Sequence, residues 1–94
     1  MRLKDRVAII TGGGSGIGAA YCRRFLAEGA QVMIADIGEV QAKRTAESLA
    51  GAGAIDWVRT DVADEASTQE CVAATLARFG RVDILLNNAA IYGD

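Results

Sequence analysis

The stretch from Val7 to Gly18 reads VAIITGGGSGIG, and it decides the fold. Its first four residues form a short apolar run, as expected of a strand that is buried on both faces of a sheet. The apolar residues that follow recur at a helical spacing and predict one helix face, made of Ile17, Tyr21, Cys22, Phe25 and Leu26. A glycine-rich turn between such elements leaves backbone N–H groups free at the positive end of a helix dipole. The stretch therefore predicts an anion site suited to a diphosphate.

Strands and helices alternate along the rest of the chain. The hydrophobic pattern predicts strands at Arg6–Thr11, Gln31–Asp36, Ala54–Thr60 and Val82–Asn87. It predicts helices at Gly16–Glu28, Glu39–Ala50 and Asp64–Phe79, with Asp64 as an N-cap and with Gly29 and Gly80 as stop signals. The apolar stripe of the second helix would consist of Val40, Ala42, Ala46 and Leu49, and that of the third of Val72, Leu76 and Phe79.

This alternation is typical of βαβ units, and the predicted fold class is α/β with a doubly wound parallel sheet. We expect the strand order 3-2-1-4 in a three-layer αβα arrangement. The first two helices would cover one face and the third helix the other. Cys22 and Cys71 would then lie on opposite faces and form no disulfide.

The composition excludes several classes of function. The 94 residues are 51% hydrophobic and 23% charged, which fits one packed domain over residues 1–94. The basic residues are scattered and the net charge is −2, so nucleic acid is a poor candidate partner. No apolar run approaches the ~20 residues that span a bilayer, and Met1–Asp5 leads straight into the first strand without room for a signal peptide. We therefore expect a cytoplasmic protein.

The chain contains no histidine, which removes histidine-based triads and most zinc sites. The two cysteines match no metal-binding spacing, so no metal site is expected. Both are interpreted as small buried thiols on helices.

The residues around the glycine turn indicate which ligand it would bind. Gly12 and Gly16 are expected to allow tight turning near a ligand, and Gly18 to let the helix pack close to the strand. Asp36 ends the second strand, where an acid can accept hydrogen bonds from the adenosine ribose. Its charge would repel a 2′-phosphate, and neither Ser15 nor Ile37 is basic, so the cofactor is predicted to be NAD rather than NADP. The alternative is that Asp36 is only a polar strand end.

Two further polar pairs lie at predicted strand ends. Asp61 and Val62 follow the third strand, where they could reach an adenine, although an Asp near a helix start more often acts as a cap. Asn87 and Asn88 end the fourth strand beside the first. Asn87 is as suited to a structural role as to a ligand, and Asn88 is the better ligand candidate.

Together these residues resemble the N-terminal half of a short-chain dehydrogenase/reductase. The resemblance rests on Thr11-Gly12-x-x-x-Gly16-x-Gly18, Asp36, Asp61-Val62 and Asn87-Asn88-Ala89 in the family's order, and it covers the whole chain. It implies that Gly12, Ser15, Gly16 and Ile17 wrap the diphosphate and that Asp36 holds the ribose. It also implies that Asp61 and Val62 contact the adenine, and that Asn88, Ala89 and Ala90 line the nicotinamide side.

The resemblance also sets expectations for catalysis. Ala90 stands where the family usually has glycine, a feature shared with members that resemble polyol dehydrogenases. Family members transfer a hydride with a Ser and a Tyr-x-x-x-Lys pair placed further along the chain. This sequence has no such pair, since its lysines are Lys4 and Lys43, so we expect no catalytic residue here and no turnover by the chain alone. The full-length form would act on an alcohol or ketone.

The last predicted strand, Val82–Asn87, would lack a neighbour on its outer side, and the chain is expected to associate with itself through this edge. Two other functions stay open at this point. One is a nucleotide-binding or interaction module that keeps the fold without catalysis. The other is a different doubly wound protein that binds a flavin or a phosphosugar, which Asp61 and the Asn87-Asn88 pair disfavour.

Overall fold

The computed structural model describes residues 2–88, and Ala89 and Ala90 lie outside the described residues. Strands and helices alternate as predicted, and each predicted element is present with ends that differ by at most two residues. In chain order the elements are β1 (Val7–Thr11), α1 (Gly16–Ala27), β2 (Gln31–Asp36), α2 (Glu39–Leu49), the 3₁₀ turn η1 (Ala50–Ala52), β3 (Ile55–Arg59), α3 (Glu65–Phe79) and β4 (Ile84–Asn87).

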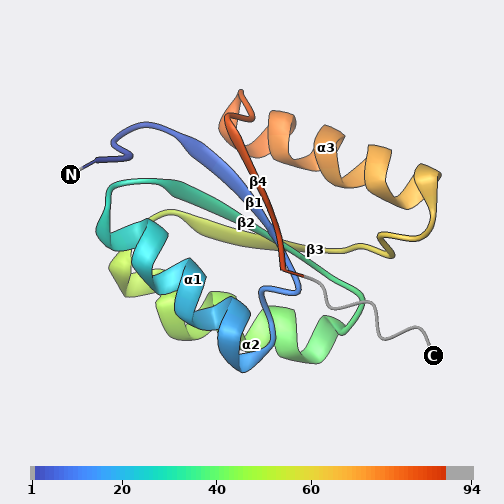
Figure 1. Cartoon of the computed structure of the whole chain (residues 1–94), viewed down its shortest axis with the longest axis horizontal. Helices are drawn as coiled ribbons and strands as arrows, with labels where there is room; N and C mark the ends of the chain where they lie inside the picture. The colour runs from blue at the N-terminus through green and yellow to red at the C-terminus, as the bar shows by residue number, and fades with distance from the viewer. Residues whose placement is uncertain (1, 89–94) are drawn as a thin grey trace.

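The four strands form one parallel sheet in the order β3-β2-β1-β4. Helices α1 and α2 cover one face and α3 covers the other, so the molecule has the three predicted layers (Figure 1). All five residues of β1 are buried, because this strand is central and has helices on both sides. The parallel order brings the carboxyl ends of β1, β2 and β4 to the same edge of the sheet.

Each face of the sheet has its own core. On the α1/α2 side the buried cluster consists of Ile10, Cys22, Leu26, Val32, Ile34, Ala42, Ala46 and Leu49. On the α3 side it is smaller and consists of Ile9, Met33, Ala35 and Cys71. Cys22 and Cys71 are both free and buried on opposite faces, which confirms the prediction. Burial raises the pKa of the Cys22 thiol to about 12 and also raises that of Cys71, so both thiols stay protonated at neutral pH.

Three predictions about helix faces are wrong in part. In α1 the buried residues are Gly18, Cys22 and Leu26, whereas Ile17 is exposed and Tyr21 is 41% exposed. The buried residues recur at every fourth position from Gly18, and Tyr21, one position before Cys22, lies about 100° away from them around the helix. In α2 the predicted stripe is buried at Ala42, Ala46 and Leu49, but its first residue, Val40, is 66% exposed.

Helix α3 differs more strongly from its predicted face. Its fully buried residues are Ser67, Cys71 and Thr75, while Val72 and Leu76 are exposed. The residues of α3 that face the sheet have small side chains, and the Thr75 hydroxyl is satisfied by donating to the Cys71 carbonyl oxygen at 2.8 Å. Val72 and Leu76 instead lie on a side of α3 that no other described element covers.

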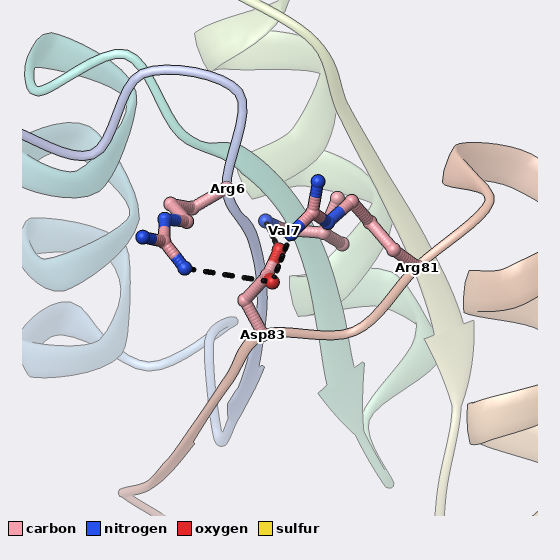
Figure 2. A network of polar contacts seen from close by, with 4 residues as sticks. All are labelled: Arg6, Val7, Arg81 and Asp83. Atoms are coloured by element: carbon pink, nitrogen blue, oxygen red, sulfur yellow. Dashed lines mark hydrogen bonds and ion pairs between the residues drawn. The ribbon is translucent and has the colours of Figure 1, made fainter.

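An ionic cluster fixes the start of β4 against the start of β1. The Asp83 carboxylate accepts a hydrogen bond from the Val7 backbone N–H at 2.8 Å and one from the Arg81 guanidinium at 2.7 Å, and Arg6 approaches to 3.8 Å (Figure 2). The Asp83 N–H donates in turn to the Val7 carbonyl oxygen at 2.9 Å. The Asp83 side chain is only 12% exposed. Its contacts with Val7 hold the start of β4 beside the start of β1 and so set the position at which β4 joins the sheet.

The cluster makes the stability of the chain depend on acid pH. The hydrogen bonds from Arg81 and Val7 lower the pKa of Asp83 below its ordinary value. A lowered pKa in the folded state means that the stabilisation is present above the unfolded pKa, and that it disappears as the pH falls below about 4. We expect Asp83→Asn to lower the melting temperature at pH 6, and the difference from wild type to shrink at lower pH. Circular dichroism melts across this range measure it.

Asp56→Asn is the matched control, because Asp56 has an arginine partner, Arg78 at 3.3 Å, but its side chain is 42% exposed, against 12% for Asp83. Its melting temperature should follow wild type closely at every pH. A gap between Asp83→Asn and wild type that stays constant down to the lowest pH would show that the carboxylate charge is not responsible.

Candidate active-site edge

The glycine turn lies at the carboxyl edge of the sheet between β1 and α1. Gly12 has a φ of 67°, a left-handed conformation that glycine adopts at little cost, and its N–H donates to the Ala35 carbonyl oxygen at 2.8 Å. A Cβ on Gly18 would overlap the Gly12 carbonyl oxygen. The expected tight turn at Gly12 and close packing at Gly18 are therefore present.

Gly16 departs from its expected role. It has no left-handed φ, and a Cβ built on it meets no atom of the described chain within 4 Å. The turn therefore does not need a glycine at this position. The space beside Gly16 is open on the outer side of the first turn of α1, so the missing side chain leaves room for a group outside the chain.

The first turn of α1 has two backbone N–H groups that can donate to a ligand. Ser15 is the N-cap, and its hydroxyl accepts from the Gly18 N–H at 3.1 Å and donates to the Gly12 carbonyl oxygen at 2.8 Å. The N–H groups of Gly16 and Ile17 have no acceptor among residues 2–88. Both residues are exposed. Ser15 thus shapes the turn with its side chain, while the next two amides are open to an anion at the positive end of the helix.

The Asp36 carboxylate lies against this turn. One of its oxygens accepts from the Gly14 N–H at 2.9 Å and the other from the Gly38 N–H at 2.9 Å. A Cβ on Gly14 would come within 2.8 Å of this carboxylate, which explains the glycine there. Each carboxylate oxygen has a further lone pair, so Asp36 is held in place and can still accept hydrogen bonds from a diol.

The ends of β1 and β4 are joined by Thr11. Its hydroxyl donates to Asn87 Oδ1 at 3.0 Å and accepts from the Asn88 N–H at 2.8 Å. The Asn88 side-chain amide donates to the Gly12 carbonyl oxygen at 3.5 Å. Both asparagines therefore have structural contacts, and Asn88 reaches the glycine turn itself.

Asp61 and Val62 lie beyond β3 at the same edge. The Asp61 carboxylate accepts from the Ala63 N–H at 3.0 Å, and the Asp61 N–H donates to the Ser67 hydroxyl at 2.8 Å. Asp64, as predicted, caps α3 by accepting from Ala66 at 3.0 Å. Val62 is partly exposed and borders a hollow of about 260 Å³ between the sheet and α3, whose lining includes Thr11, Thr60, Val72, Leu85 and Asn87.

The sequence pattern missed one feature of this edge. Arg59, the last residue of β3, is the register partner of Asp36 and forms an ion pair with Glu39 at 4.0 Å. Glu39 and Arg59 are twenty positions apart in the sequence, so only the strand register could have indicated their contact. Within the described residues no group of three acidic, histidine or cysteine side chains could hold a metal ion. No helix of residues 2–88 has the length and apolar character to cross a bilayer.

Comparisons with known proteins agree with this geometry. The family model described as short chain dehydrogenase matches residues 6–94. The chain is 45% identical over 92 residues to a sorbitol dehydrogenase of Cereibacter sphaeroides, and the match covers 98% of this chain but 35% of that protein. The chain therefore spans about a third of the length of this relative.

Two solved structures share both fold and sequence. A short chain dehydrogenase from Mycobacterium smegmatis is 37% identical with a TM-score of 0.91, and the match covers 98% of this chain and 40% of that one. A short chain dehydrogenase/reductase from Burkholderia phymatum, solved in complex with NAD, is 38% identical with a TM-score of 0.84. This match covers 90% of the present chain and 31% of the Burkholderia chain. The glycine turn, the carboxylate at the tip of β2 and these matches lead to one conclusion: the chain belongs to the short-chain dehydrogenase/reductase family.

Proposed function

We propose that this chain is the NAD-binding portion of a cytoplasmic short-chain oxidoreductase that acts on an alcohol or ketone, with a polyol as the first substrate class to test. The observation that carries the proposal is the position of the Asp36 carboxylate, 2.9 Å from the Gly14 amide of the glycine turn. A sugar bound by this carboxylate would lie next to the open amides of Gly16 and Ile17. A nucleotide diphosphate needs this combination of a ribose acceptor and open amides at a helix N-terminus.

Four parts of a dinucleotide would have partners among the described residues. The turn from Gly12 to Gly18 offers amides to a diphosphate, and the open space at Gly16 lets the diphosphate approach the backbone. Asp36 would hold the ribose, and Asp61 and Val62 would border the adenine. Asn88 would line the nicotinamide side, a role that the family resemblance extends to Ala89 and Ala90. When bound, the nicotinamide supplies hydride transfer, and this chain contributes binding and orientation.

The substrate class rests on two supports. The relative from Cereibacter sphaeroides is named a sorbitol dehydrogenase. Ala90 adds a methyl group where a glycine is usual in the family. Oxidation of sorbitol by the full-length protein, followed as NADH formation, tests this part, and failure with every polyol tried would restrict the proposal to other alcohols.

Cofactor binding is tested by titrating the chain with NADH and following its fluorescence. We expect Asp36→Ala to weaken binding about tenfold or more, because the ribose loses its charged acceptor. Asp36→Asn removes the charge but keeps one acceptor oxygen, which can bind either the Gly14 or the Gly38 amide, so it preserves more of the turn than Asp36→Ala does. Glu47→Ala, on the exposed side of α2, is the control. Equal NADH affinity in all four proteins would show that Asp36 does not hold the ribose.

We also propose that the chain associates with a second copy of itself through β4. Among residues 2–88 this strand pairs with β1 alone, so its outer edge presents backbone groups to solvent. Leu85 on this strand is 66% exposed. A two-fold contact would pair this edge with the same edge of the partner.

A further inference from the structure

The tip of β3 places a cation beside the proposed ribose site. Ile34 and Trp57 are register partners that both pack into the core on the α1/α2 side. Two residues further along each strand, Asp36 and Arg59 are register partners as well. Side chains two positions apart on a strand share a face, so Asp36 and Arg59 lie on the same side of the sheet.

The cation is shared with a second carboxylate. Arg59 Nε lies 4.0 Å from Glu39 Oε2 in the first turn of α2, and both side chains are more than half exposed. An exposed pair at this distance is weak, so Glu39 acts on Arg59 through its charge and does not hold the guanidinium in one fixed geometry. Around the proposed ribose position, Asp36 and Glu39 together carry two negative charges against the single positive charge of Arg59.

We infer that Arg59 is a specificity-determining residue of the ribose site, and that Glu39 keeps it from binding a 2′-phosphate. The inference rests on the proposed NAD-binding function and adds a second determinant to Asp36. A guanidinium is suited to a phosphate because it offers paired N–H donors. With Glu39 and Asp36 both charged, the three side chains carry a net charge of −1, so the site opposes a 2′-phosphate and favours the ribose diol of NADH. Without one of these carboxylates, Arg59 would accept the phosphate of NADPH.

The experiment measures NADH and NADPH dissociation constants by nucleotide fluorescence for a small set of variants. We expect Glu39→Gln to tighten NADPH binding about fivefold while NADH binding changes less than about twofold. Adding Arg59→Gln to Glu39→Gln should return NADPH to its wild-type affinity. Asp36→Ser should also gain NADPH affinity, and Asp36→Ser with Arg59→Gln should lose that gain.

Glu47→Gln is the matched control, since it removes the same charge from an exposed position two turns further along α2. It should leave the ratio of the two constants unchanged. If Glu47→Gln shifts the ratio as much as Glu39→Gln, or if Arg59→Gln has no effect in either background, the inference is overturned while NADH binding still supports the proposed function. Absence of NADH binding by the wild-type chain would overturn both.

Discussion

Replacing Gly18 by alanine should cost the chain at least about 3 kcal/mol of unfolding free energy. The added Cβ would overlap the Gly12 carbonyl oxygen and press on the Gly13 backbone, and none of these atoms belongs to a side chain that could rotate away. Relief would require α1 to move off β1. For a chain of this size the melting temperature should fall by roughly 10 °C or more, which thermal or urea unfolding would measure.

Gly16→Ala is the matched substitution two residues earlier in the same helix. A Cβ there meets nothing, so stability should stay the same or rise by up to ~1 kcal/mol, because alanine favours a helix over glycine. Its NADH affinity should nevertheless fall about tenfold, since the methyl group occupies the space proposed for the diphosphate. The two variants separate the glycine that the fold needs from the one that the ligand needs. Unimpaired NADH binding by Gly16→Ala would place the diphosphate elsewhere.

The sheet could be predicted from the sequence because the signals for its strands and helices lie in neighbouring residues. The apolar run of β1 and the alternation of elements define a parallel sheet, and glycine with a left-handed φ stops α1 and α3 at Gly29 and Gly80 as expected. The position of Asp36 at the tip of β2 follows from strand length alone. These features depend on neighbouring residues and on general rules of chain connection.

The helix faces and the charge around the ribose site depend on packing, which the pattern does not contain. An apolar periodicity cannot indicate that α3 buries Ser67 and Thr75 while Val72 stays exposed. The contact of Arg59 with Glu39 follows from the β2–β3 register. The sequence also does not indicate whether a glycine is needed by the turn or by a ligand. Gly16 and Gly18 differ only in the space around them, since a Cβ would meet nothing at Gly16 but would overlap the Gly12 carbonyl oxygen at Gly18.

The second large effect is expected at the free edge of β4. Leu85→Lys should convert the associated chain to a monomer, because it places a charge on an apolar edge strand that otherwise pairs with its copy. Two copies of Leu85 would each contribute about 1.5–3 kcal/mol if fully buried in the contact, so the dissociation constant should rise by about 100-fold or more. Sedimentation velocity over a range of protein concentrations measures this directly.

Val40→Lys provides a control of equal exposure, because Val40 on α2 is also 66% exposed but lies on the other side of the sheet. The same charge there should leave the association unchanged. Association that responds equally to both substitutions would reflect net charge and not the β4 edge. A wild-type chain that sediments as a monomer at every concentration would rule out the proposed contact, and the exposed Leu85, Val72 and Leu76 would then be tolerated in water without a partner copy.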